Sequence, residues 1–203
     1  MFDTSSPIAP LTLDDGGAVM NPKAMLAIGM TVGVLAGVGG WARAAQDKYT
    51  VRVQDGLLFS DFRGYEDWQL ISVSQANGLI SAILGNPIII EAYRAGVPGN
   101  KQPFPDGARM AKIHWTPKPS ESFPTAIGPG TQHDVDFMVK DSKKFADSGG
   151  WGYAAFKYDA KSDTFSPLTL DDHPPQGNDA KCGFACHTVV KSRDYVFTDY
   201  ARR

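Results

Sequence analysis

Short apolar runs separated by glycine and proline make up most of the chain from residue 45 onward. In two of these runs, 108–115 and 135–140, apolar and polar side chains alternate, and this period of two predicts strands with one buried face. Similar runs predict further strands at 69–74, 79–84 and 151–158. The pattern indicates a mainly β (α+β) fold, a single domain built on an antiparallel β-sheet with a few short helices.

Two short helices are expected between the strands. Asn86 and Pro87 have the side chains preferred at the N-cap and in the first turn, so they predict the start of a helix over 88–95. Asp141 is expected to cap a second helix over 142–147. Each helix would connect two strands of the sheet.

Two longer segments lack a clear period. Residues 116–130 are rich in proline, glycine and serine, which predicts a long loop. Residues 159–181 are polar and rich in aspartate and proline, which predicts a connector leading to the C-terminal segment.

The N-terminal 44 residues have the features of an export signal. An uncharged, mostly apolar run over 24–40 follows Lys23 and ends in the small-x-small pattern at 42–44, which is typical of a cleaved secretory signal peptide. An uncleaved membrane anchor is the alternative, although the run is near the lower length limit for a span. The residues before Met20 are polar and acidic, whereas the start of a signal peptide is normally basic. This favours Met20 as the residue at which translation begins. We therefore expect a periplasmic protein with no stable membrane span after cleavage.

The charge balance narrows the class of partner. The formal net charge is −2, and no run of lysine and arginine suggests a polybasic patch. Nucleic acid is therefore not an expected partner. Residues 45–203 have enough length and apolar content for one hydrophobic core, and their expected partners are small molecules and electron-transfer proteins.

Both cysteines of the chain lie in one short motif. Cys182 and Cys186 are separated by three residues, and His187 follows directly. This arrangement is typical of covalent haem attachment, in which two thiols bond to the vinyl groups and the adjacent histidine ligates the iron. The usual spacing has two residues between the cysteines, so we expect the loop to bulge here, with Gly183 allowing a positive φ.

Two other uses of this motif are considered. The cysteines are close enough for a strained local disulfide, which is the expected state of unused thiols in an oxidising compartment. They also match half of a zinc site, but the other histidines, His114, His133 and His173, show no paired ligand spacing. Neither alternative explains why His187 directly follows the second cysteine, so haem is favoured.

Four stretches of the chain resemble the cytochrome P-460 family, which includes the cytochromes c′-beta. They are the Phe-Pro-Asp-Gly turn at 104–107 with the following Ala111-Lys112, residues 139–142, residues 149–152, and the motif at 182–187 with 193–198. The resemblance identifies 45–203 as a cytochrome P-460-like haem domain. It implies an antiparallel β fold, usually a homodimer, and one c-type haem with an iron-ligating histidine and an open distal side.

The resemblance also gives two residues a role in catalysis. A lysine shortly after the turn is bonded to the porphyrin edge in cytochromes P-460, and Lys112 stands at the matching place. This implies oxidation of hydroxylamine with nitric oxide chemistry close by. Asp136 is the candidate proton acceptor, with Asp134 on the same face as the alternative. A solvated Lys112 and Asp136, and an ordinary strand histidine at His114, remain the simpler interpretations.

The motif and the family resemblance are compatible with three functions. The first is a hydroxylamine-oxidising enzyme that passes electrons to a periplasmic acceptor. The second is a module of the c′-beta type that binds nitric oxide or carbon monoxide in an apolar pocket, with aromatic candidates at Phe62, Phe104, Trp115, Phe137 and Trp151. The third is a simple electron carrier in which Met110 or Met138 supplies a second axial ligand.

Overall fold

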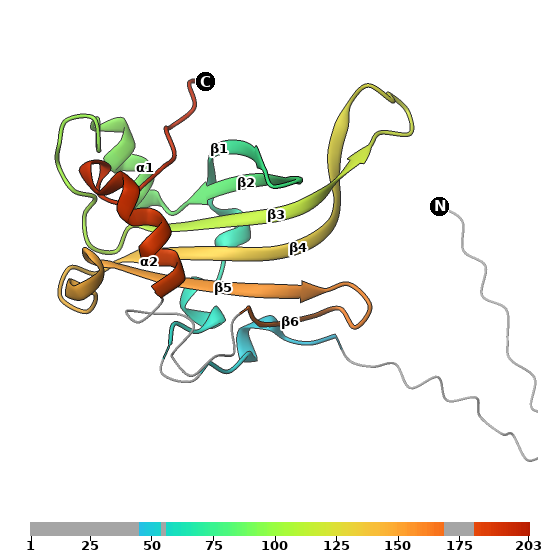
Figure 1. Ribbon diagram of the computed structural model, residues 1–203, viewed down its shortest axis with the longest axis horizontal. Coiled ribbons are helices and arrows are strands. Elements are labelled where there is room, and N and C mark those ends of the chain that lie inside the picture. Colours follow the sequence, from blue (N-terminus) through green and yellow to red (C-terminus); the bar gives the residue numbers. More distant parts are fainter. Residues whose placement is uncertain (1–44, 54–55, 169–180) are drawn as a thin grey trace, which may run out of the picture. The chain divides into compact units, whose positions relative to one another are not determined.

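Six strands form one antiparallel sheet in which every strand pairs with its neighbours in sequence (Figure 1). This confirms the predicted mainly β fold, and all of the expected strands are present. The strands are β1 (Gln69–Ala76), β2 (Leu79–Gly85), β3 (Arg109–Pro119), β4 (Ile127–Lys140), β5 (Trp151–Asp159) and β6 (Thr164–Pro167).

The computed structural model describes residues 45–53, 56–168 and 181–203. The expected export signal at 1–44 and His173 lie outside the described residues. Within the described ranges, no helix is long and apolar enough to cross a membrane.

The helices are short and lie between strands or near the ends of the described chain. They are the α-helices α1 (Pro87–Arg94) and α2 (Lys181–His187) and the 3-10 helices η1 (Lys48–Thr50), η2 (Phe59–Phe62), η3 (Tyr65–Asp67), η4 (Ala146–Ser148) and η5 (Thr188–Arg193). The predicted cap of α1 is confirmed, because Asn86 Oδ1 accepts hydrogen bonds from the backbone of Ile89 and Arg109. Asp141 caps a turn as expected, accepting from the backbone of Lys143 and Lys144, but an irregular turn and η4 replace the predicted α-helix.

The prediction of a long loop at 116–130 is wrong. β3 continues to Pro119 and β4 begins at Ile127, so the two strands extend as a projecting hairpin (Figure 1). Pro117 pairs opposite Pro129, next to an irregularity in the register at Trp115. Proline is tolerated at such irregular positions because no ladder hydrogen bond from its nitrogen is needed.

The connector prediction for 159–181 missed strand β6. Its four residues pair with the outer edge of β5, and the Phe165 ring packs against Phe59 and Tyr158. The backbone nitrogen of Phe165 donates to Gln46 Oε1 at 2.6 Å. So short an edge strand, with one large apolar residue, gives no period that sequence inspection can detect.

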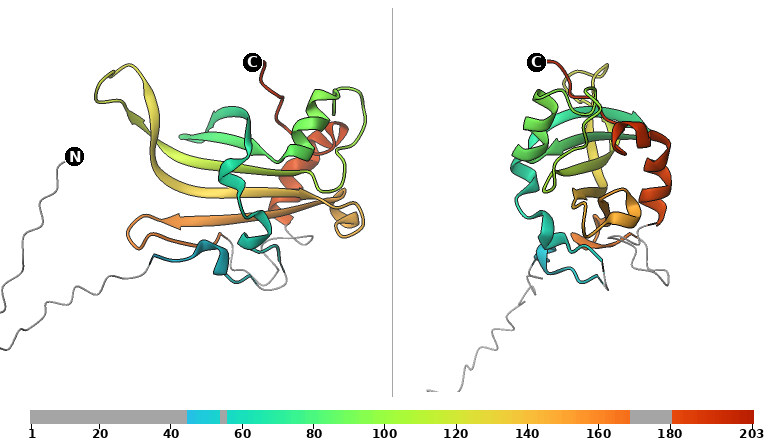
Figure 2. Two further views of the ribbon diagram at one scale, coloured as in Figure 1. Left: turned by 180° about the vertical axis from the view of Figure 1, so that it is seen from behind. Right: turned by 90° about the vertical axis from the view of Figure 1, so that its left-hand side faces the viewer.

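Both faces of the sheet are covered, and each carries its own hydrophobic core. Figure 2 shows α2 on one face and the N-terminal 3-10 helices on the other. β4 was expected to be half-buried, yet Met138 and Lys140 on its second face are only 8% and 5% exposed. The end of the sheet that carries α1 and α2 is therefore the middle layer of a three-layer arrangement.

Candidate functional site

The cysteine motif forms helix α2 rather than a bulged loop. Cys182 and Cys186 are four residues apart, so they lie on the same face of this helix, and both are exposed free thiols. His187 is the next residue and points about 100° away from Cys186 around the helix axis. The expectation of a bulge was wrong because a four-residue separation already aligns the two thiols on one helical face.

Gly183 is needed for packing and not for a positive φ. It lies inside α2 and is not among the residues with left-handed backbone conformation. A Cβ atom at this position would lie 2.7 Å from Cγ of Tyr153, closer than real Cβ atoms approach. The glycine therefore lets α2 lie directly on strand β5.

His187 is held in one tautomer by the chain that follows it. Its Nδ1 lies 2.7 Å from the carbonyl oxygen of Tyr195, and because a carbonyl can only accept, Nδ1 carries the proton. The imidazole is also packed between the rings of Tyr153 and Phe197, with centroid distances of 5.2 and 5.0 Å. This leaves Nε2 with its lone pair, the arrangement found in metal-binding histidines.

Lys112 and Asp136 lie close to His187. They are paired across β3 and β4, so their side chains share the face of the sheet on which α2 lies. Burial lowers the pKa of His187, the Tyr195 carbonyl opposes this, and of the two side chains Lys112 lowers that pKa further while Asp136 raises it. The structure thus brings together three of the predicted site residues from distant parts of the sequence.

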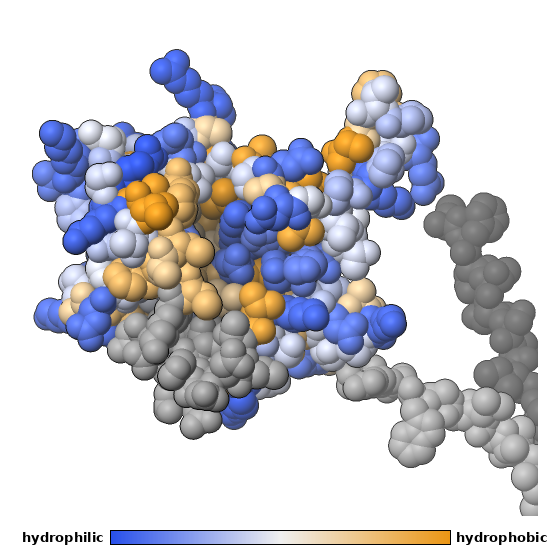
Figure 3. Space-filling model, in the orientation of Figure 1, coloured by the Kyte–Doolittle hydropathy of each residue, from blue (hydrophilic) through white to orange (hydrophobic). Residues whose placement is uncertain are grey.

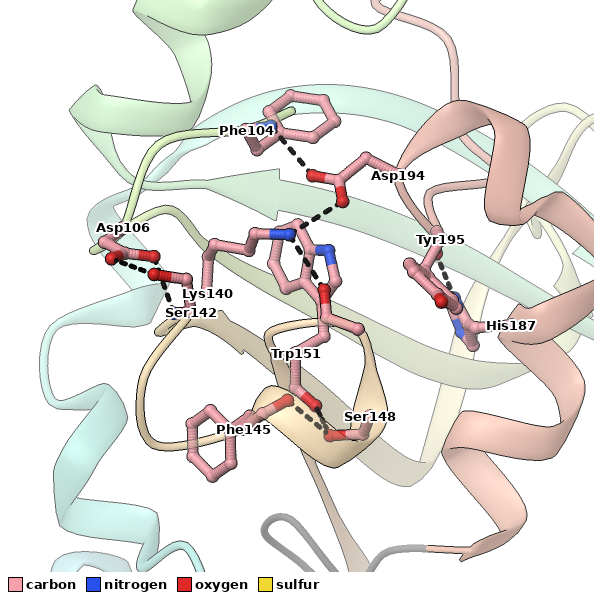
Figure 4. A network of polar contacts seen from close by, with 11 residues as sticks. Phe104, Asp106, Lys140, Ser142, Phe145, Ser148, Trp151, His187, Asp194 and Tyr195 are labelled. Atoms are coloured by element: carbon pink, nitrogen blue, oxygen red, sulfur yellow. Dashed lines mark hydrogen bonds and ion pairs between the residues drawn. The ribbon is translucent and has the colours of Figure 1, made fainter. Parts of the chain in front are cut away.

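A buried ion pair fixes the carbonyl that holds His187 (Figure 4). Lys140 Nζ donates to Asp194 Oδ1 at 2.7 Å and to the carbonyl of Gly149 at 3.0 Å. The second oxygen of Asp194 accepts from the backbone nitrogen of Phe104 at 2.8 Å. Asp194 and Tyr195 both have positive φ, a conformation that is costly for these residues and must be stabilised by surrounding contacts.

The same network joins the four stretches that carry the family resemblance. Lys140, Gly149, Phe104 and Asp194 each belong to a different stretch and meet at the ion pair. Hydrogen bonds from Ser142 to Asp106 link two of these stretches again and lower the pKa of the Asp106 carboxyl. The stretches therefore have a common structural role, which is to position the segment that orients His187.

His114 and Asp134 also lie on this face, and His114, interpreted from the sequence as an ordinary strand histidine, contacts both acidic side chains there. His114 Nε2 lies 3.2 Å from Asp136 Oδ2 and 3.8 Å from Asp134 Oδ1, and its Nδ1 contacts Ser81 Oγ at 3.1 Å. No spacing along the chain indicates this cluster, since its members come from three strands. Only the register of β3 against β4, which the sequence does not give, brings these side chains together.

The other candidates from the sequence lie mainly in the two hydrophobic cores. Met110 and Met138 are buried in the core on the α2 face. Phe62 and Phe137 stack at 4.1 Å in the core on the opposite face, and Phe104 and Trp151 pack edge to face beneath the ion pair. The rings proposed for an apolar pocket thus belong mostly to the two cores.

The donor set on and around α2 fits a haem. Two exposed thiols share one helical face, and the adjacent histidine has its Nε2 free of hydrogen-bond partners among the described residues. Figure 3 shows apolar surface over α2 beside hydrophilic surface over the middle of β3 and β4. Val189 on η5 and Phe197 beside His187 are exposed apolar side chains, and the buried hydroxyl of Tyr153 has no described partner.

The comparison with known families agrees with this arrangement. A family model described as cytochrome P-460 matches residues 62–198, more than half of the chain. The match spans β1 to β6, α2 and the segment that orients His187. A search of curated proteins gives no match. The chain therefore belongs to the cytochrome P-460 family and is a haem protein of that family.

Proposed function

We propose that the haem is of the c type, bonded through the sulfurs of Cys182 and Cys186 and ligated by Nε2 of His187. The two thiols on one face of α2 and the proton on Nδ1 support this assignment. The Tyr195 carbonyl keeps that proton in place and orients the ring. The ion pair of Lys140 and Asp194 keeps the carbonyl in place in turn.

We propose further that the protein oxidises hydroxylamine and passes the electrons to a periplasmic electron-transfer protein. When bound, the haem supplies the redox centre on which the small molecule loses its electrons. Oxidation of hydroxylamine to nitric oxide releases as many protons as electrons, so a proton acceptor beside the haem is required. Asp136 is that acceptor, and Lys112 is the residue that modifies the porphyrin edge.

The observation that carries this proposal is the Lys112 and Asp136 pair across β3 and β4. Lys112 lowers the pKa of His187 and Asp136 raises it, which supports a position of both side chains beside a haem that His187 would ligate. The carboxylate of Asp136 is 44% exposed and close to His114 Nε2. It can therefore receive a proton from a small molecule and share it with an imidazole.

Steady-state turnover of hydroxylamine with an electron acceptor tests the proposal. Asp136→Asn keeps the shape of the side chain but removes its basicity, and it is expected to lower kcat by roughly 10²-fold or more, as loss of a general base does. Asp67→Asn is the matched control, because Asp67 is an exposed carboxylate on η3 and should leave kcat unchanged. Equal turnover of the two variants would remove Asp136 from the mechanism.

Peptide mass analysis tests the role of Lys112. A haem-linked peptide that contains Lys112, in addition to the one that contains both cysteines, is expected in the purified protein. Its absence, together with binding of nitric oxide or carbon monoxide but no turnover of hydroxylamine, would instead favour a gas-binding protein of the c′-beta type. The charged side chains around Asp136 argue against the apolar pocket that such a protein would need.

The compartment, the homodimer and the partner are parts of the same proposal. The sequence pattern at 1–44 and the chemistry of haem attachment to thiols both favour a periplasmic protein. Cell fractionation should find the haem-containing chain in the periplasm without its first 44 residues. Light scattering of that product should give the mass of two chains.

A further inference from the structure

Beside the site proposed for the haem, three side chains form a cluster with metal-ligating groups. His114 on β3 and Asp134 and Asp136 on β4 each offer one ligand atom, and these atoms lie within 4.8 Å of one another. His114 and Asp134 are paired in register across the two strands, so the rigid middle of the sheet fixes their positions. Asp134 is buried, whereas the carboxylate of Asp136 is 44% exposed and leaves the cluster open to solvent.

The buried carboxylate of Asp134 is incompletely satisfied. Its Oδ2 accepts from Nδ1 of His133 at 2.8 Å, but its Oδ1 has no hydrogen-bond partner in the described structure. Only 8% of the residue is exposed, so water from the surface does not solvate this oxygen freely. A buried carboxylate oxygen without a partner is costly, and a cation is the partner that offsets this cost most strongly.

The orientation of His114 adds a second observation. Its Nδ1 lies 3.1 Å from Oγ of Ser81, a buried hydroxyl on β2. Because Ser81 Oγ can accept a proton from Nδ1, Nε2 can present its lone pair to an ion that also binds the oxygens of Asp134 and Asp136. Three ligand atoms within 4.8 Å of one another fit a metal site, and a hydroxyl on Nδ1 is the kind of outer partner that ligating histidines have.

The distances fit a small divalent ion. Tetrahedral zinc, with bonds of about 2.0–2.1 Å, has ligand atoms about 3.3 Å apart. Nε2 of His114 lies 3.2 Å from Asp136 Oδ2 and 3.8 Å from Asp134 Oδ1, and all three ligand atoms lie within 4.8 Å of one another, so the two carboxylates would draw closer together around the ion. One imidazole with two carboxylates suits zinc better than magnesium or calcium, which prefer oxygen alone.

We propose that His114, Asp134 and Asp136 bind one zinc ion, with Ser81 holding His114 in the ligating tautomer. The fourth position of the ion is open on the side of the exposed Asp136. The site uses neither the thiols of α2 nor His187 as a ligand.

A consequence of the site rests on the function proposed above. Zinc bound to Asp136 lowers the basicity of this carboxylate and thus its ability to accept a proton, so zinc would inhibit hydroxylamine oxidation. Turnover should fall with the same zinc concentration dependence that direct binding measurements give. Unchanged turnover at zinc concentrations that fill the site would overturn this consequence, whereas the binding measurement tests the site whether or not the protein is an oxidase.

Titration calorimetry with zinc chloride on the haem-loaded, chelator-treated protein tests the site. One ion per chain is expected, with at least 10-fold weaker binding in His114→Ala and Asp134→Asn. Ser81→Ala should weaken binding about 10-fold, because it removes only the outer partner. Asp67→Asn is the control and should bind as the unaltered chain does. Binding that is absent, or unaffected by His114→Ala, overturns the proposal.

X-ray absorption at the zinc edge tests the site in the unaltered protein, so its result does not depend on whether any variant folds. The unaltered protein should show nitrogen and oxygen ligands at about 2.0–2.1 Å and no sulfur at about 2.3 Å. A sulfur shell would place the ion on the cysteines of α2 and refute the proposed site.

Discussion

Asp194→Asn is the most informative single perturbation of the structure that orients His187. The carboxylate accepts from Lys140 Nζ at 2.7 Å and from the backbone nitrogen of Phe104 at 2.8 Å. Asparagine has nearly the same shape but carries no charge and offers only one acceptor oxygen. The amide oxygen can replace only one of the two carboxylate oxygens, and the buried Lys140 ammonium loses its counter-charge, with the Gly149 carbonyl and the face of Trp151 as its other described partners.

The size of the effect follows from burial. The side chains of Lys140 and Asp194 are 6% and 13% exposed, and removing one partner of so buried a pair costs about 3–5 kcal/mol. Arg193 and Asp199 form a matched surface pair, because their side chains are 38% and 82% exposed. Asp199→Asn should therefore cost at most about 1 kcal/mol.

Urea unfolding of the haem-loaded variants at neutral pH measures both costs. A double variant with Lys140→Met and Asp194→Asn removes both charges and keeps at 194 a residue that tolerates positive φ, and it should be more stable than Asp194→Asn alone because no uncompensated charge remains. If Asp194→Asn lowers the free energy of unfolding by no more than Asp199→Asn does, the buried ion pair does not have the stabilising role described here.

Further predictions concern α2 and its histidine. Gly183→Ala should lower the free energy of unfolding by about 1–3 kcal/mol because its Cβ meets a buried ring, whereas Gly128→Ala, with open space around it, should be nearly neutral. In haem-free protein, NMR titration should show the pKa of His187 rising in Lys112→Met and falling in Asp136→Asn. Because folding lowers this pKa, the haem-free protein should lose stability as the pH falls through about 6.5, the ordinary value, which urea unfolding at several pH values measures.

The sequence predicted those helices and strands that depend on interactions between residues near one another in the chain. Alternation along 108–115 and 135–140 located β3 and β4, and the Asn86 cap located α1, because periodicity and capping act over a few residues. The hairpin beyond Trp115 was missed because its prolines and glycines resemble a loop, and its pairing depends on the partner strand.

The site was predicted in part for the same reason. The cysteines and His187 form a local motif, and Lys112 and Asp136 were recognised through a family resemblance. The cluster around His114 depends on strand register, and the role of Gly183 depends on Tyr153 packed against it. Contacts of this kind lie between elements, so no pattern along the chain reports them.

The helix α2 also accommodates the wider spacing of the cysteines. A separation of four residues in a helix aligns the thiols, and the following residue turns toward the sheet. The unusual spacing and the helical conformation are therefore consistent with each other.

Mass analysis of the exported protein, combined with its pyridine haemochrome spectrum, tests the central claim most directly. The account predicts a c-type spectrum and one haem bonded to the peptide that contains Cys182 and Cys186. A colourless product whose two cysteines are joined in a disulfide would contradict it.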